Sequence, residues 1–151
     1  MKHSIRRPYF AYGSNLNLTQ MQTRCPTALP LYALAIVDWS LIFRETLDIF
    51  PSPGNRVVGA LYSVTAFDVM ALDEYEGVRD RCYSQIEVRI SDSGEMAFAY
   101  RMYGGESVCP PSADYLANVE EGFRDWRLPL DTLEAALSHS RRMSPIVRKV
   151  A

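Results

Sequence analysis

The chain has 151 residues, of which 48% are hydrophobic and 23% are charged, and its formal net charge is −2. This size and composition predict one globular domain over residues 1–151 with a sizeable core. The nearly balanced charge gives no field that would attract nucleic acid or an anionic membrane, and no apolar stretch approaches the roughly 20 residues that cross a bilayer. The N-terminus has basic residues but no apolar signal-peptide core, so we expect a cytoplasmic protein.

The cysteines and histidines do not have the spacing of a metal site. Cys25, Cys82 and Cys109 lie far apart, no Cys-x-x-Cys pair occurs, and only His3 and His139 could supplement them. Neither histidine lies in a context that suggests a partner for a catalytic cysteine. We therefore expect free thiols in a reducing compartment, with no metal and no cofactor.

The hydrophobic pattern predicts mostly strands in the first hundred residues and two helices after them. Branched and aromatic runs or alternation indicate strands, whereas apolar residues spaced by three and four indicate helices. In chain order we expect a strand over residues 8–12, a helix over 17–24 with Asn15 or Asn17 as N-cap, strands over 33–43 and 56–64, a helix from Thr65 to Glu76, strands over 83–90 and 95–103, and helices over 112–126 and 130–140.

Turn and cap residues set the boundaries of these elements. Residues 51–54 are expected to form a turn that separates two strands, and residues 92–94 a hairpin turn. Gly59 indicates a bulge or a close backbone approach, and Thr65 and Asp68 have the spacing of a capping box. Hairpin connections favour an α+β fold with a mixed, mainly antiparallel sheet, curved or closed into a small β-barrel, with flanking helices.

The loop after the first predicted strand is the first candidate for a binding site. Its sequence is Tyr12-Gly13-Ser14-Asn15-Leu16. A strand that ends in a glycine turn and continues into a helix start presents backbone N–H groups that suit a carboxylate, a phosphate or a developing oxyanion. Because Gly-Ser-Asn is also ordinary turn chemistry, the loop indicates a site only together with an acid–base residue elsewhere.

Glu76 is the candidate for that acid–base residue. It lies in the last turn of its predicted helix, just before Gly77, where the helix dipole disfavours a negative charge. Asp73 is three residues earlier on the same face, so repulsion is expected to add to this effect. Both effects would raise the pKa of Glu76, which suits a group that accepts and returns a proton near neutral pH. Asp73 and Glu74 themselves are expected to be solvated.

These motifs resemble those of the γ-glutamylcyclotransferases. The ordered set covers residues 8–138 and comprises Tyr-Gly-Ser-Asn-Leu at residues 12–16, Ser-Pro-Gly at 52–54 with Val57 to Tyr62, Leu-Asp-x-x-Glu-Gly-Val at 72–78, Tyr83, Pro110 to Tyr115, and Leu128 to Leu130. The resemblance implies a small mixed barrel with flanking helices. It also implies a reaction in which a γ-glutamyl group cyclises to 5-oxoproline and releases an amino acid or an amine.

By the same resemblance, Glu76 is the general acid/base, the loop from Tyr12 to Leu16 holds the γ-glutamyl end of the substrate, and Tyr83 and Tyr115 line the pocket. The nucleophile is the substrate's own α-amine, so the reaction calls for no serine or cysteine nucleophile, no metal and no cofactor. The expected partner is a small γ-glutamyl compound. A homodimer stays open, because no heptad seam or contiguous apolar surface can be identified.

Several alternatives remain at this stage. The loop donors suit either the substrate α-carboxylate or the amide oxyanion. The segment over residues 44–50 looks shorter than in the animal enzymes, and a loop there would border the acceptor pocket, so the leaving group is open. One alternative is the same chemistry on a γ-glutamyl-protected amine in a biosynthetic or resistance pathway. A non-catalytic module that binds a small ligand would instead leave Glu76 dispensable.

Overall fold

Five strands and four α-helices form the described part of the chain, which is residues 5–91, 93–104 and 106–143 of a computed structural model. In chain order these are β1 (Arg7–Ala11), a 3-10 turn η1 (Ser14–Leu16), α1 (Leu18–Arg24), β2 (Leu29–Arg44), β3 (Thr46–Val64), α2 (Ala66–Tyr75), β4 (Tyr83–Arg89), β5 (Met96–Met102), α3 (Ala113–Asp125) and α4 (Asp131–Met143).

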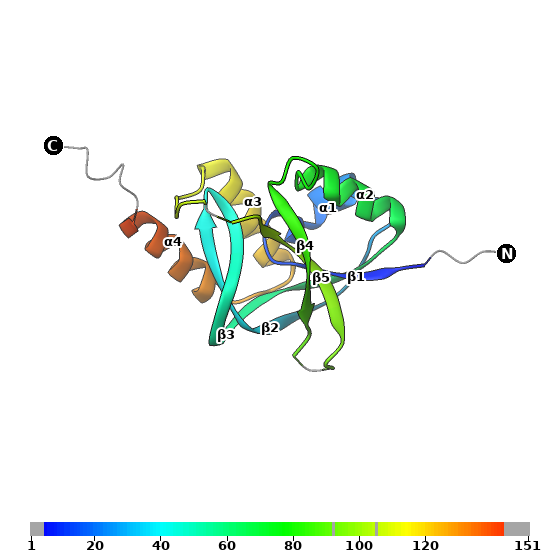
Figure 1. Cartoon of the computed structure of the whole chain (residues 1–151), viewed down its shortest axis with the longest axis horizontal. Coiled ribbons are helices and arrows are strands. Elements are labelled where there is room, and N and C mark those ends of the chain that lie inside the picture. Colours follow the sequence, from blue (N-terminus) through cyan, green and yellow to red (C-terminus); the bar gives the residue numbers. More distant parts are fainter. Residues whose placement is uncertain (1–4, 92, 105, 144–151) are drawn as a thin grey trace.

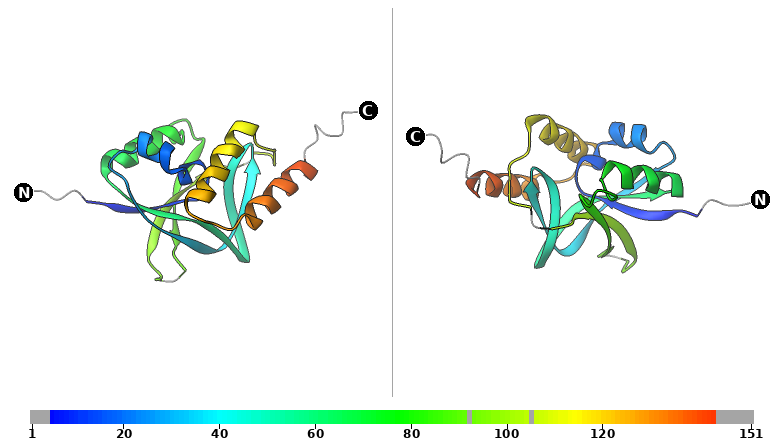
Figure 2. Two further views of the ribbon diagram at one scale, coloured as in Figure 1. Left: turned by 180° about the vertical axis from the view of Figure 1, so that it is seen from behind. Right: turned by 45° about the horizontal axis from the view of Figure 1, so that its top comes forward.

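The strands form one curved sheet in the order β2-β3-β1-β5-β4. Every neighbouring pair is antiparallel except β1 and β5, which are parallel. The two edges approach each other at an isolated antiparallel bridge between Ile36 and Ile90, but no ladder closes the barrel. Helices α1, α2 and α3 lie together over one side of the sheet, whereas α4 lies beside β2 and β3 (Figures 1 and 2). The predicted α+β class with a mixed, mainly antiparallel sheet is confirmed.

The two strands predicted over residues 33–43 and 56–64 are present as parts of β2 and β3, but the chain reverses between Arg44 and Thr46, and residues 51–54 lie inside β3, so the predicted position of the turn was wrong. β3 pairs with β2 on both sides of the segment, with Trp39 opposite Pro51 and Val37 opposite Arg56. Asp38 faces the bulged segment, and its carboxylate accepts the Gly54 N–H at 2.9 Å. The turn residues therefore form a bulge, because β2 continues past them. The predicted hairpin turn at 92–94 includes Asp92, which lies outside the described residues.

Two local predictions that position the site are confirmed. A Cβ atom on Gly59 would lie 2.6 Å from the Phe10 ring, so only glycine allows β1 and β3 to approach this closely. Thr65 and Asp68 form a capping box at the start of α2. The close approach to β3 thus positions β1, and the capping box fixes the start of α2. The ends of both elements carry the residues described below.

Two further observations concern the cysteines and the helices. The thiols of Cys25, Cys82 and Cys109 are free, as predicted. None of the helices in the described ranges has both the length and the apolar character that crossing a membrane requires.

Candidate active site

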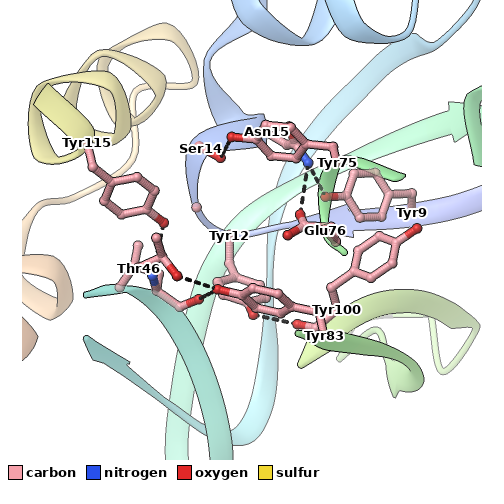
Figure 3. A pocket seen from close by; sticks show the side chains of 12 residues that line it. Tyr9, Tyr12, Ser14, Asn15, Thr46, Tyr75, Glu76, Tyr83, Tyr100 and Tyr115 are labelled. Atoms are coloured by element: carbon pink, nitrogen blue, oxygen red, sulfur yellow. Dashed lines mark hydrogen bonds between the residues drawn. The ribbon is translucent and has the colours of Figure 1, made fainter. Parts of the chain in front are cut away.

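A cavity of about 260 Å³ lies where the loop after β1, the end of α2 and the start of β3 meet. Its volume suits part of a small metabolite rather than a polymer. Side chains from these segments and from β4, β5 and α3 point into it (Figure 3). The lining residues are Tyr9, Tyr12, Gly13, Ser14, Asn15, Thr46, Leu47, Tyr75, Glu76, Tyr83, Tyr100 and Tyr115.

The structure brings together every residue that the sequence singled out for the site except Leu16. Asn15 of the loop and Glu76 at the end of α2 are far apart in sequence, yet Asn15 Nδ2 lies 3.4 Å from Glu76 Oε2 (Figure 3). The Leu16 side chain is fully buried in the core, and its carbonyl accepts the indole N–H of Trp126 at 2.9 Å. Leu16 therefore anchors the loop and does not line the cavity.

Glu76 is held at the C-cap of α2. Its N–H donates to the Leu72 carbonyl at 2.8 Å, which completes the last helical turn. Gly77 follows with φ +68°, a conformation that glycine adopts readily and that turns the chain away from the helix axis. The predicted helix end is confirmed.

Burial raises the pKa of Glu76 to about 7, and the positive charge of Arg24 partly opposes this rise. The predicted direction is therefore confirmed, but the expected repulsion from Asp73 was wrong. Asp73 is half-buried and satisfied, since Oδ1 accepts from the Tyr100 hydroxyl at 2.6 Å and from Gln85 Nε2 at 2.7 Å. Glu74 is exposed, as expected. The Glu76 side chain is half-buried where it lines the cavity, and this partial removal from water brings the pKa of its carboxyl near neutrality.

The two asparagines of the loop region have separate functions. Asn17 is the N-cap of α1, and its side chain accepts the Gln20 N–H at 3.1 Å. Asn15 instead turns to the cavity, where Nδ2 donates to the Tyr9 hydroxyl at 2.9 Å as well as to Glu76. Its Oδ1 accepts from Arg24. The choice that the sequence left between the two N-cap candidates is therefore decided for Asn17.

Three backbone N–H groups of the loop are free to bind a ligand. Gly13, Ser14 and Asn15 line the cavity, and within the described residues no acceptor is found for their amide hydrogens. The downstream amides are engaged, since the Leu16 N–H donates to the Gly13 carbonyl at 3.0 Å. That these N–H groups point into the cavity, as the glycine turn predicts, stays a prediction.

Tyr83 and Tyr115 bind the backbone at the start of β3. The Tyr83 hydroxyl donates to the Leu47 carbonyl at 2.8 Å and lies 2.7 Å from Thr46 Oγ1. The Tyr115 hydroxyl accepts the Leu47 N–H at 2.9 Å, which leaves its own proton available to the cavity. Burial raises the pKa of both tyrosines, so both are neutral hydrogen-bonding groups at physiological pH.

Comparison with known proteins agrees with these features. The family model described as the AIG2-like family matches residues 56–135. A γ-glutamylcyclotransferase from Bos taurus is 34% identical over 82% of this chain and 73% of its own length. The enzyme of that name from Homo sapiens is 30% identical over 83% of this chain and 74% of its own. The chain belongs to the γ-glutamylcyclotransferase family.

A solved structure named γ-glutamyl cyclotransferase supports the same assignment. It superimposes on this family member with a TM-score of 0.75 and 27% identity, covering 87% of this chain and 86% of its own. The α+β fold with its curved sheet is thus the fold of the family.

Sequence reasoning on this family member missed several residues of the site. Tyr9 lies on β1, where both faces of the strand are buried, so alternation did not distinguish it. Thr46 and Leu47 belong to the segment that was expected to be a loop bordering the acceptor pocket; the segment borders the cavity, but as the start of β3. No motif pointed to Tyr75 or Tyr100, although Tyr75 is adjacent to Glu76.

A second, more open cavity of about 490 Å³ adjoins the first. Both cavities are lined by Thr46, Tyr75, Glu76 and Tyr83. The outer one is otherwise bordered mainly by charged side chains, namely Arg44, Glu45, Asp80, Arg81 and Glu106. No group of three or more His, Cys, Asp or Glu side chains gathers to hold a metal in the described ranges.

Proposed function

We propose that the chain is a γ-glutamylcyclotransferase that converts a γ-glutamyl amino acid or peptide into 5-oxoproline and the released amine. The substrate's α-amine attacks its own γ-carbonyl carbon, a five-membered ring closes, and the bond to the leaving nitrogen breaks. The observation that carries this proposal is Glu76, a half-buried carboxyl whose pKa is raised to about 7 at the wall of a small cavity.

Glu76 supplies both proton transfers in this mechanism. As the carboxylate, it takes a proton from the α-ammonium group so that the amine becomes nucleophilic. As the carboxylic acid, it then returns a proton to the departing nitrogen. A pKa near the working pH populates both forms, which is the condition for one group to act in both steps.

The loop after β1 holds the γ-glutamyl end in this proposal. The free N–H groups of Gly13, Ser14 and Asn15 are donors suited to the substrate α-carboxylate or to the oxygen that becomes negative during attack. The Tyr115 hydroxyl, which lies 3.2 Å from the position of a Cβ atom on Gly13, adds a donor beside the loop. Holding the γ-glutamyl chain folded converts ring closure into a reaction with a high effective molarity.

A second candidate substrate class follows from the outer cavity, which would receive the departing half. Arg44 is paired with Asp48 at 2.9 Å and donates to the Glu106 carbonyl at 2.7 Å, so its charge is compensated. The carboxylates of Glu45, Asp80 and Glu106 then outnumber the remaining guanidinium, that of Arg81. This balance favours a departing half that carries a second, protonated amine, which makes a γ-glutamyl-protected diamine the second candidate beside the γ-glutamyl amino acids and peptides.

Release of 5-oxoproline from a panel of γ-glutamyl compounds tests both points. The panel pairs γ-glutamyl amino acids with γ-glutamyl diamines of similar length, and each is assayed with the wild type and with Glu76→Gln. Turnover of either class by the wild type, but not by Glu76→Gln, supports cyclotransfer. The ratio of the kcat/KM values for the two classes identifies the preferred leaving group. If the wild type releases no 5-oxoproline from any compound, the non-catalytic binding module becomes the better explanation.

A further inference from the structure

Arg24, the last residue of α1, completes a set of polar contacts behind the proposed catalytic group. Its Nη1 donates to Asn15 Oδ1, and its guanidinium carbon lies 3.4 Å from the centroid of the Tyr75 ring. Asn15 in turn donates to Glu76, while the Tyr75 hydroxyl lies 3.0 Å from Ser14 Oγ. Arg24 thus contacts both neighbours of the carboxyl without lining the cavity itself.

The contact between Arg24 and Asn15 determines which end of the amide faces Glu76. A guanidinium has only donors, so it must meet the oxygen of the Asn15 amide. The nitrogen is then directed at the Glu76 carboxylate and at the Tyr9 hydroxyl. The reversed amide would set an oxygen against the carboxylate, an arrangement of two acceptors that repel each other.

The charge of Arg24 acts on Glu76 as well. Arg24 is half-buried, and the one ion pair within the described ranges joins Arg44 to Asp48, so Arg24 has no carboxylate partner of its own there. It is the charged group that lowers the pKa of Glu76, against the larger effect of burial. Stacking on the Tyr75 ring holds the guanidinium, and with it the positive charge, beside Glu76.

We propose that Arg24 is a positioning residue for the cyclotransfer site, which orients the Asn15 amide toward Glu76 and keeps the carboxyl partly ionised at neutral pH. The inference rests on the proposed function, because it concerns the group that moves the protons there. It assigns a function to a residue that neither a motif nor the cavity lining identified.

The other titratable groups around Glu76 do not replace this charge. The tyrosines that face it from β1, the loop, β4, β5 and α3 have pKa values raised by burial, so they are neutral at physiological pH. Tyr75 precedes Glu76 in the chain, and Asp73 is bonded to Tyr100 and Gln85. The charged and thiol groups nearby are those of the outer cavity, namely Arg44, Glu45, Asp80, Arg81, Cys82 and Glu106.

Three substitutions separate the two effects of Arg24. Arg24→Met removes both the charge and the hydrogen bond, Arg24→Lys keeps the charge, and Arg24→Gln keeps an N–H donor without the charge. Arg142→Met, at the exposed end of α4, is the matched control. For each variant we would measure the thermal midpoint, the pH profile of kcat/KM, and the titration of the Glu76 carboxyl by NMR with labelled glutamate, assigned with Glu76→Gln.

We expect the Glu76 titration and the acid limb of the kcat/KM profile to move upward by about one pH unit in Arg24→Met and Arg24→Gln, and to stay in place in Arg24→Lys. We also expect kcat in Arg24→Met to fall about tenfold, with KM nearly unchanged, because the loss is one of orientation in the transition state. An unchanged Glu76 titration in a folded variant that lacks the charge overturns the proposal.

Different results would contradict the two proposals, namely cyclotransfer and the positioning function of Arg24. The titration needs no turnover, so it reports on Arg24 even if the wild type proves to release no 5-oxoproline. If Arg24→Met does not fold, Arg24→Gln carries the same test of the charge. A wild type that is active while its variants keep the wild-type Glu76 titration would leave cyclotransfer intact and remove only the function of Arg24.

Discussion

The two adjoining cavities are built from different kinds of side chain. Apart from the residues that line both cavities, the inner cavity is lined by groups that bind one another or the backbone, such as Tyr115, whose hydroxyl accepts the Leu47 N–H. The outer one is bordered by exposed charged side chains, among them Glu45, Asp80 and Arg81. A wall of hydrogen-bonded side chains suits a chemical group that never changes, whereas exposed charged side chains tolerate variation. In the proposed reaction, the inner cavity therefore takes the constant γ-glutamyl group and the outer one the variable leaving group.

The largest expected effect is loss of the proton-transfer group. Glu76→Gln keeps the size of the side chain but removes its ability to accept a proton, so kcat should fall by about 10²–10⁴-fold, the range typical of general acid–base groups. Glu74→Gln, on the exposed face of the same helix, is the matched control and should keep wild-type kcat. Steady-state release of 5-oxoproline measures both. Near-normal turnover by Glu76→Gln would show that Glu76 does not move the protons.

The next largest effect is expected in the pH dependence of the free energy of unfolding, because the pKa of Glu76 is raised from 4.5 to about 7 in the folded state. The folded chain then binds one proton more than the unfolded chain between these two values, so the free energy of unfolding should decrease as the pH rises through this window. The decrease amounts to about 2–3 kcal/mol and is complete above pH 8.

Urea unfolding at pH 5 and pH 8 measures this decrease. Glu76→Gln should lose it, since glutamine does not titrate. An equal pH dependence in the wild type and in Glu76→Gln would contradict the raised pKa.

Those parts of the fold and site that depend on neighbours in sequence were predictable. Gly77 ends α2 beside Glu76, and the capping box at Thr65 begins it, so the orientation of the helix end followed from local residues. The glycine turn after β1 likewise predicted free N–H groups. In contrast, the orientation of Leu16 was not predictable from its motif, because the 3-10 turn sends successive side chains in different directions and only packing decides which is buried.

The predictions that were wrong all depend on contacts with residues that are distant in sequence. The turn signal at residues 51–54 is correct locally, but whether it reverses the chain or bulges depends on Asp38 across the sheet. The raised pKa of Glu76 was attributed to the helix dipole and to its helix neighbour Asp73, but its largest cause is burial by the surrounding elements, and Asp73 is hydrogen-bonded to Tyr100. Arg24 could not be singled out, since its contact with Tyr75 exists only once α1 and α2 lie side by side.

A smaller effect should follow from loosening the inner cavity. Tyr115→Phe leaves the Leu47 N–H without its acceptor, which should cost about 1–2 kcal/mol of stability, and it removes the hydroxyl donor proposed to hold the substrate, which should cost about tenfold in kcat/KM. Tyr32→Phe is the control, because Tyr32 is exposed on β2. Chemical denaturation and steady-state kinetics measure the two quantities. A loss of stability without a loss of rate would mean that Tyr115 supports the wall but does not help to hold the substrate.

The smallest effect is expected from substitutions in the outer cavity, which should alter the preference between substrate classes and leave the rate of the chemical step unchanged. Reversing two of the charges with Asp80→Lys and Glu106→Lys should raise KM for γ-glutamyl diamines and lower KM for γ-glutamyl amino acids, each by about threefold, since exposed charges interact weakly through water. The change should shrink in high salt, which screens these charges, while kcat stays at the wild-type value. A fall in kcat on both substrate classes would show that the outer cavity belongs to the catalytic machinery, and the division between a fixed inner cavity and a permissive outer one would then be wrong.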